Sequence, residues 1–222
     1  MIRNQSRSVF KLFLFFALVS AACSLTDLAD FFGAYPTQSG ALLFQDGFDD
    51  PSSGWDRVHD QQGLTDYENG RYRILVNEQN ADFWANPDLD FRDVVIDVDA
   101  EKVAGPDDND FGVLCRYQDI ENFYFLIISS DGYYGIGKVE GGEQSLLDPP
   151  QMYYSEVILT GNTTNHLTAR CKGAELKLAV NNQLIAEARD DTFSEGDVGL
   201  IVGTFSEPGV DILFDNFSVK VP

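Results

Sequence analysis

Residues 165–189 read NHLTARCKGAELKLAVNNQLIAEAR. Apolar residues occupy every second position on both sides of Gly173, and the alternation resumes after Asn181-Asn182. A period of two is typical of β-strands that bury one face, and an Asn-Asn pair between two such runs favours a tight hairpin turn. This stretch therefore predicts consecutive antiparallel strands.

The same pattern continues in both directions along the chain. Alternating apolar residues occupy 94–100, Asn69-Gly70 separates two strand-like runs, and Asp131-Gly132 separates two more. Turn residues recur about every eight to twelve positions, which is the spacing of a β-sandwich rather than of βαβ units. We expect an all-β, antiparallel two-sheet sandwich that forms a single domain over residues 43–222.

The first 22 residues are typical of an export signal. Arg3, Arg7 and Lys11 form a basic segment, and the apolar run at 12–19 is too short to span a bilayer as a mature helix. Ser20-Ala21-Ala22-Cys23 follows, and small residues before a cysteine indicate a lipoprotein cleavage site with Cys23 acylated.

Two features of this segment bear on the anchor. Ser20 occupies the position where a lipoprotein signal usually has leucine, so cleavage by an ordinary signal peptidase is the alternative. Residues 23–42 contain Pro36 and Gly40 and lack a regular period, which predicts a lipidated tether. The localisation that follows is exported and membrane-anchored on the extracytoplasmic face, at the cell surface or in the periplasm.

The charge of the chain excludes one class of partner. The 222 residues contain 36 acids and 15 basic residues, for a net charge of −21, and the first 22 residues contain no acid. A surface this acidic repels phosphate backbones, so we expect no nucleic-acid binding. The expected contact with a membrane is through the N-terminal lipid.

Two cysteines remain once Cys23 is lipidated. Cys115 shares its strand face with Phe111 and Val113, and Cys171 lies on the apolar side of its own strand. Two inward-facing thiols in an exported protein favour a disulfide, and two unpaired buried thiols are the alternative.

Several segments in order resemble a known group of domains. The run from Asn165 to Leu184 resembles a strand pair of laminin-G-like and concanavalin A-like jelly rolls, and Gly196-Asp197-Val198-Gly199-Leu200 and Phe214-Asp215-Asn216-Phe217 resemble their closing strands. Residues 46–55 resemble the opening of those domains. Among them, the 3-keto-disaccharide hydrolase-like and exo-inulinase-associated domains are the most similar. The resemblance covers residues 44–221 and implies a jelly roll from a group that includes sugar binders and some glycoside-acting enzymes.

One acidic strand is the candidate for catalysis. Asp97, Asp99 and Glu101 share a face, and paired carboxylates are able to hydrolyse a glycoside if one of them stays protonated. Their spacing departs from the Glu-x-Asp-x-x-Glu motif of the related hydrolases. The alternative, which we favour, is a solvated outer strand face.

Two sets of acids are candidate ligands for a structural Ca²⁺. Asp107, Asp108 and Asp110 lie in one loop, where the alternative is an acidic turn. Asp46 and Asp215 occupy apolar strand faces at the two ends of the domain, where the alternative is that they accept hydrogen bonds at turns.

Aromatic side chains on neighbouring strands are the candidate ligand contacts. Tyr117, Tyr124 and Tyr133, together with Arg116, predict a surface that binds carbohydrate or a cell-envelope glycan; the further candidates are Trp84, Asn122, Tyr134 and Asp131. We expect a non-catalytic binding module anchored by lipid outside the cytoplasm. The alternatives are a glycoside hydrolase that uses the acids of 97–101, or a structural protein of the envelope.

Overall fold

A computed structural model describes residues 38–147 and 150–222. The predicted signal peptide, Cys23 with its predicted lipid, and the predicted tether up to residue 37 lie outside the described residues. In the part that is described, no helix has the length and apolar character needed to cross a membrane. Backbone pairing with the C-terminal end of the chain begins at Gly40, whose N–H donates to the carbonyl of Val221 at 2.7 Å.

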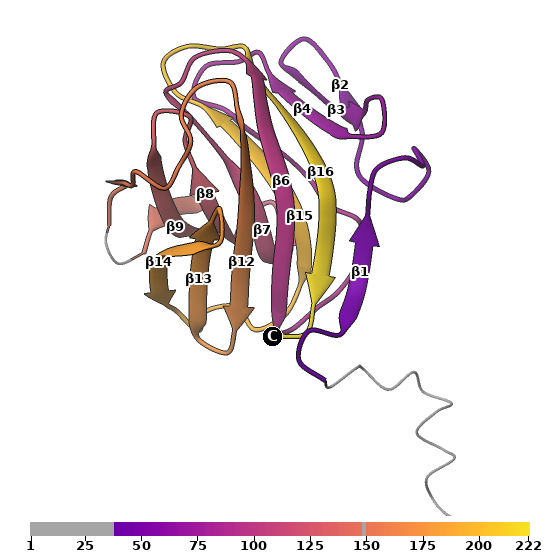
Figure 1. Cartoon of the computed structure of the whole chain (residues 1–222), viewed down its shortest axis with the longest axis vertical. Coiled ribbons are helices and arrows are strands. Elements are labelled where there is room, and N and C mark those ends of the chain that lie inside the picture. The colour runs from indigo at the N-terminus through magenta and orange to yellow at the C-terminus, as the bar shows by residue number, and fades with distance from the viewer. Residues whose placement is uncertain (1–37, 148–149) are drawn as a thin grey trace, which may run out of the picture. The chain divides into compact units, whose positions relative to one another are not determined.

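Two antiparallel sheets pack face to face, as expected from the period-two pattern (Figure 1). The first sheet contains nine strands: β1 (Leu42–Asp46), β2 (Val58–His59), β3 (Gly63–Tyr67), β4 (Tyr72–Val76), β6 (Val94–Ala104), β12 (Thr164–Lys172), β13 (Glu175–Val180), β14 (Gln183–Arg189) and β16 (Val210–Lys220). Its strand order is β14-β13-β12-β6-β16-β4-β3-β2, and β1 pairs with β16.

The second sheet contains seven strands: β5 (Asp82–Ala85), β7 (Asn109–Asp119), β8 (Asn122–Ile128), β9 (Tyr133–Glu140), β10 (Glu143–Leu146), β11 (Tyr153–Tyr154) and β15 (Asp197–Thr204). Its strand order is β10-β9-β8-β7-β15-β5, and β11 pairs with β9. Strands far apart in sequence are therefore neighbours: β15 lies between β5 and β7.

The predicted hairpin turns are confirmed. Asn181 and Asn182 have φ angles of 49° and 65° between β13 and β14, and Asn69 and Gly70 have φ angles of 52° and 75° between β3 and β4. Two consecutive residues with positive φ match the right-handed twist of the flanking strands, and Asn and Gly adopt that conformation most readily.

A disulfide joins the two sheets through the core. Cys115 on β7 and Cys171 on β12 are bonded, with their Cα atoms 6.7 Å apart. Both side chains are fully buried among the inward-facing residues of the two sheets. The predicted pairing is confirmed, and the alternative of two unpaired thiols is not observed.

Candidate functional site

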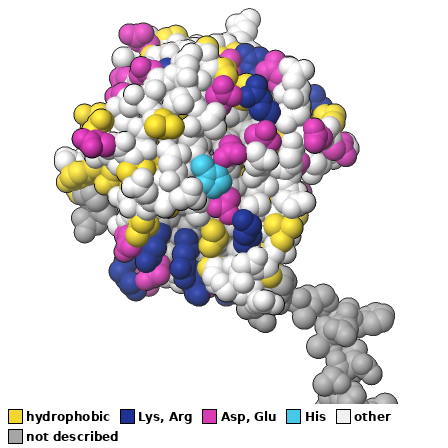
Figure 2. All heavy atoms as spheres, viewed as in Figure 1, with side chains coloured by type: hydrophobic (Ala, Val, Ile, Leu, Met, Phe, Trp, Pro, Cys, Tyr) yellow, Lys and Arg dark blue, Asp and Glu magenta, His cyan; other side chains and the backbone are white. Residues whose placement is uncertain are grey.

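The three acids of β6 lie on the outward face of the nine-stranded sheet. Acidic and basic side chains are interspersed on this face (Figure 2). Each of the three acids contacts a basic side chain: Asp97 with Lys220 at 2.8 Å, Asp99 with His166 at 2.7 Å and Glu101 with Arg71 at 2.5 Å. This arrangement matches the interpretation of a solvated, ion-paired strand face.

Arg116 does not lie on a ligand-binding surface, so that prediction is wrong. A β-bulge interrupts the register of β7 after Cys115, and Arg116 adopts a φ of 53° within it. The bulge breaks the simple alternation and turns the side chain inward. The guanidinium is 2% exposed and donates to the carbonyls of Gly173 at 2.8 Å and Phe193 at 2.7 Å.

Tyr124 is also wrong as a surface contact. It pairs with Cys115, so the two side chains point into the sandwich together, and Tyr124 is fully buried. Its hydroxyl donates to Asp190 and accepts the backbone N–H of Phe193 at 3.1 Å. Because β8 is apolar on both faces, the alternation of its side chains did not show which face points toward the other sheet.

The outward face of the seven-stranded sheet carries a second apolar cluster, separate from the core between the sheets. Its buried members are Leu114, Phe123, Phe125, Ile127, Val139 and Ile201. Trp84 and Tyr117 are half-buried at its edge, and their ring centroids lie 5.6 Å and 5.5 Å from that of Phe123. We call Trp84, Tyr117 and these six residues the outer aromatic face.

A pair of carboxylates lies on the same face. Gly203 of β15 pairs with Asp82 of β5 on one side and with Asp110 of β7 on the other, so the two acids flank one glycine. A Cβ on Gly203 would lie 2.3 Å from an oxygen of Asp82 and 2.6 Å from one of Asp110. The two carboxylates therefore meet above the glycine, and only glycine leaves them room.

The carboxylate pair has altered acidity. Burial and the nearby charge of Asp82 raise the pKa of Asp110 to about 8, and burial raises the pKa of Asp82 as well. Two carboxylates that share a poorly hydrated place do not both ionise easily. At neutral pH the pair holds a proton, which gives it a donor as well as acceptors for the hydroxyl groups of a ligand.

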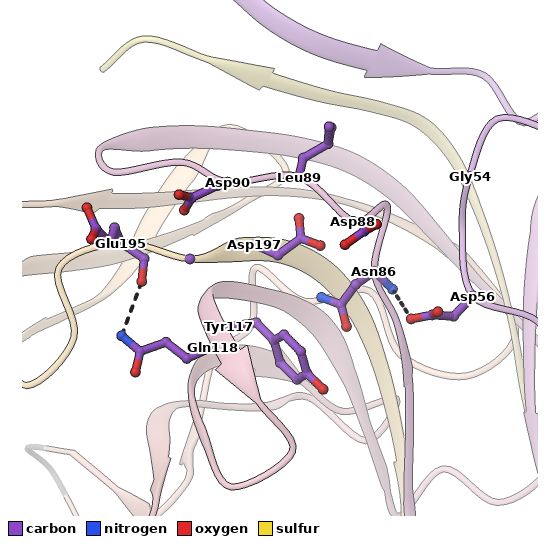
Figure 3. Close-up of a pocket in the computed structure, with 11 residues that line it drawn as sticks. Gly54, Asp56, Asn86, Asp88, Leu89, Asp90, Tyr117, Gln118, Glu195 and Asp197 are labelled. Carbon is purple, nitrogen blue, oxygen red and sulfur yellow. Dashed lines mark hydrogen bonds between the residues drawn. The ribbon is translucent and has the colours of Figure 1, made fainter.

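A pocket of about 790 Å³ opens at one end of the sandwich (Figure 3). It is formed by the β1–β2 connection, the loop after β5, the bulged end of β7 and the start of β15, and its acidic side chains are Asp56, Asp88, Asp90, Glu195 and Asp197. We call this the end pocket. It is connected to the outer aromatic face by Tyr117, which belongs to both.

One polar atom at the end pocket has no partner. Asn86 is 5% exposed, and its Nδ2 donates to the carbonyl of Val198 at 2.7 Å. Its Oδ1 is buried and has no hydrogen bond to any described residue. A buried acceptor without a donor costs free energy, so this carbonyl oxygen differs from the other polar atoms at the end pocket.

Two carboxylates approach each other in the end pocket. Figure 3 shows the side chains of Asp88 and Asp197 directed toward one another. Burial raises the pKa of Asp197 to about 6, three backbone N–H groups oppose this, and the charge of Asp88 adds to the rise. A bound cation would relieve the repulsion between the two acids.

Tyr133 is an exposed candidate, as predicted, at the other end of the seven-stranded sheet. It is 42% exposed and its ring lies 5.8 Å from that of Tyr154. It lines a smaller pocket of about 420 Å³ together with Asp108 and Asp131. Its role in ligand binding stays a prediction.

The acids of the 105–110 loop do not converge. Asp107 forms an ion pair with Lys102, Asp108 lines the smaller pocket, and Asp110 turns onto the outer aromatic face because β7 begins at Asn109. Throughout the described ranges, no three His, Cys, Asp or Glu side chains are grouped as a metal site would need. The three loop acids therefore do not form a set of ligands around one ion. Binding of a structural Ca²⁺ elsewhere stays a prediction.

Asp46 and Asp215 accept hydrogen bonds, which is the alternative given for them. Asp46 accepts the N–H of Phe48 at 2.7 Å and the indole Nε1–H of Trp55 at 3.0 Å. Asp215 accepts the N–H of Asn216 at 2.7 Å. Asp46 lies opposite Phe217 and Asp215 lies opposite Asp99, and a cation shared by the two aspartates stays a prediction.

Sequence reasoning missed Asp82, Asn86, Asp88 and Asp197. The first two lie on or directly after β5, which is a short strand, and Asp197 begins β15. Glycine at positions 199 and 203 of β15, which share one strand face, was the available signal, because small residues in a central strand often admit a close approach by neighbouring groups. Trp84 had been a further candidate, and it does lie on the outer aromatic face.

Comparison with solved structures identifies the fold. A carbohydrate-binding module from Bacillus subtilis matches with a TM-score of 0.63 at 20% identity, over 76% of this chain and 96% of that one. A Bacillus subtilis protein of unknown function with a galectin-like fold has a TM-score of 0.62 at 12% identity, over 82% and 97% of the two chains.

A third match is the catalytic domain of an endo-1,3-β-glucanase (laminarinase) from Thermotoga petrophila. Its TM-score is 0.57 at 11% identity, over 82% of this chain and 98% of that domain. No protein-family model and no curated protein matches the sequence. The chain therefore has the jelly-roll β-sandwich fold that the sequence predicted.

Proposed function

We propose that this protein is a non-catalytic module that binds carbohydrate on the outer aromatic face. The observation that carries the proposal is half-buried Trp84, which lies two residues along β5 from Asp82 of the carboxyl pair and whose indole Nε1–H points to the hydroxyl of half-buried Tyr117 at 3.4 Å. Flat aromatic rings contact the C–H faces of a sugar ring, and adjacent carboxyl groups bond its hydroxyls.

The shared fold supports this proposal. A carbohydrate-binding module and a laminarinase domain are built on the same sandwich at low sequence identity. Fold alone does not define a ligand, so the argument depends on the site. The proposed ligand contacts differ from those predicted from the sequence. Tyr124 and Arg116 are buried and are left out, and Trp84 and the carboxyl pair are added.

A glycan array followed by calorimetry with the purified protein tests the proposal. We expect Trp84→Ala and Tyr117→Ala each to weaken binding of the selected glycan by about tenfold, because each removes a stacking surface. Leu184→Ala is the matched control, since Leu184 is 56% exposed on β14 of the other sheet. Absence of glycan binding, or equal losses in all three variants, contradicts the proposal.

The carboxyl pair favours a second candidate function, hydrolysis of a glycoside. Retaining glycosidases use two carboxyl groups close together, one of them protonated near neutral pH. Asp110 meets the second requirement through its raised pKa, and Asp82 is adjacent to it. Product analysis with any glycan that binds distinguishes the candidates: cleavage that is lost in Asp110→Asn, with binding retained, identifies an enzyme.

We further propose that the protein is exported and anchored by lipid at Cys23. The disulfide supports export, because such bonds persist in oxidising compartments. A lipid at Cys23 would hold the sandwich at the membrane surface. Cys23→Ala is expected to move the protein from the membrane fraction to the soluble fraction; its retention in membranes contradicts lipid anchoring.

A further inference from the structure

We propose that the end pocket binds the protonated amine of an amino sugar, so that the protein prefers glycans carrying free amino groups. This inference rests on the proposed carbohydrate-binding function and specifies its substrate class. It concerns a different surface from the stacking contact of Trp84, which allows the two proposals to be tested separately.

The electrostatics of the end pocket favour a cation. Its lining includes five acidic side chains, and no described residue that lines it is basic. Glu195 is partly neutralised by Arg92 at 2.7 Å, and Asp56 accepts the backbone N–H of Asn86 at 3.2 Å. Asp88 and Asp197 face each other, so a positive group between them gains two attractive contacts and removes a repulsive one (Figure 3).

Asn86 provides an observation that is independent of the charges. Its Oδ1 is an acceptor, is nine-tenths buried with the rest of the side chain and has no partner among the described residues. Asn86 lines the end pocket and lies two residues before Asp88 in the sequence. Figure 3 shows the Oδ1 of Asn86 on the side of its carboxamide toward Tyr117, so an ammonium or hydroxyl group that reaches this part of the end pocket supplies the missing donor, which a neutral acceptor group would not do.

The size and composition of the end pocket favour an organic cation over a bare metal ion. A volume of about 790 Å³ is within the range of small-molecule sites. Calcium needs six to eight oxygen ligands held close together, and the described residues contain no group of three acids able to act as one metal site. An ammonium group requires only three acceptors.

Tyr117 connects the end pocket to the stacking surface and favours a sugar over a basic peptide. Its ring contacts the outer aromatic face through Phe123, while the residue also lines the end pocket beside Gln118. A sugar unit stacked at Tyr117 therefore continues directly into the acidic end pocket. The carboxamide of Gln118 and the hydroxyl of Tyr117 add contacts for neutral hydroxyl groups there.

Calorimetry with a glucosamine tetramer and its fully N-acetylated counterpart tests the inference, because acetylation removes the charge and keeps the sugar ring. At pH 7 and low salt we expect the amine form to bind about tenfold tighter or more, and Asp88→Asn to remove that preference. Asp88 is exposed and has a φ of 60°, which Asn tolerates, so the variant should fold. Asp191→Asn, an exposed acid outside the end pocket, is the matched control.

The outcomes separate this inference from the proposed function. Equal affinity for the two tetramers, or equal effects of Asp88→Asn and Asp191→Asn, overturns the amine preference. If neutral glycans still bind and depend on Trp84, the proposed function stands alone. If no glycan binds and a lysine-rich peptide binds in an Asp88-dependent way, both proposals are overturned.

Discussion

Asp110 shows how one side chain acquires an unusual acidity from its position in the sheet. It is 5% exposed, and its neighbour across Gly203 is another carboxylate. Burial and the second negative charge both disfavour its ionised form, and no basic side chain is paired with it in the described ranges. The unfolded chain ionises this group near its usual pKa, so the folded state binds the proton more tightly.

Stability should therefore fall as pH rises from about 4 to the folded pKa of about 8. Below pH 4 the Asp110 carboxyl is protonated in both the folded and the unfolded state, so it does not reduce the stability. Above pH 8 it is ionised in both states, and the loss of stability is complete. Asp110→Asn removes the ionisable group, so we expect it to raise the Tm by roughly 3 °C or more at pH 8 and to change it little at pH 4. Thermal unfolding of both proteins across this range measures the effect, and a pH-independent difference would contradict it.

Within the strands, glycines decide how closely the chains approach. Gly112 on β7 lies against β8, and a Cβ there would be 2.1 Å from the carbonyl oxygen of Leu126. That oxygen belongs to the backbone and is fixed by the sheet, so the two strands would have to separate. Gly47, by contrast, follows β1 and a Cβ there would meet nothing closer than 3.9 Å.

We expect Gly112→Ala to lower the free energy of unfolding by about 3 kcal/mol, because it forces a steric overlap in the sheet. Gly47→Ala is the control and should change it by less than about 1 kcal/mol. Urea denaturation followed by tryptophan fluorescence measures both. Similar stability of the two variants would show that β7 and β8 are not as close as described.

Local sequence patterns predicted these strands well. The direction of individual site side chains was harder to predict, because it depends on a β-bulge and on which strand face is buried. Alternation and the Asn-Asn and Asn-Gly pairs were sufficient to place β3, β4, β13 and β14. The β-bulge at Arg116 turns its side chain opposite to the direction that alternation predicts, and nothing local in the sequence marks that bulge. The direction of Tyr124 required knowing which side of an apolar strand faces the other sheet.

The candidate site was harder to predict because it depends on distant strands that become neighbours. Asp82 and Asp110 meet only because β15, which begins 78 residues after the end of β7, is inserted between β5 and β7. The end pocket likewise combines four segments that are separate in the sequence. Alternation predicts which residues share a strand face, and it does not give the order of strands in a sheet.

Apart from the backbone itself, the disulfide is the single covalent link between the two sheets within the described residues. It links β7 to β12 across the core and closes a loop with a sequence separation of 56 residues. A cross-link of this length restricts the unfolded chain far more than the folded one, which already holds both strands in place. Its contribution is thus to the stability of the sandwich rather than to the geometry of either sheet.

We expect Cys115→Ala combined with Cys171→Ala to lower the free energy of unfolding by about 4 kcal/mol, since a loop of this size loses that much conformational entropy when closed. Urea denaturation of the variant and of the native protein, each with and without reductant, measures the change. Reductant should shift the midpoint of the native protein only, toward that of the variant. A native midpoint that reductant leaves unchanged, even after prolonged unfolding, would mean that the two sulfurs are not joined and that the sheets pack together without this cross-link.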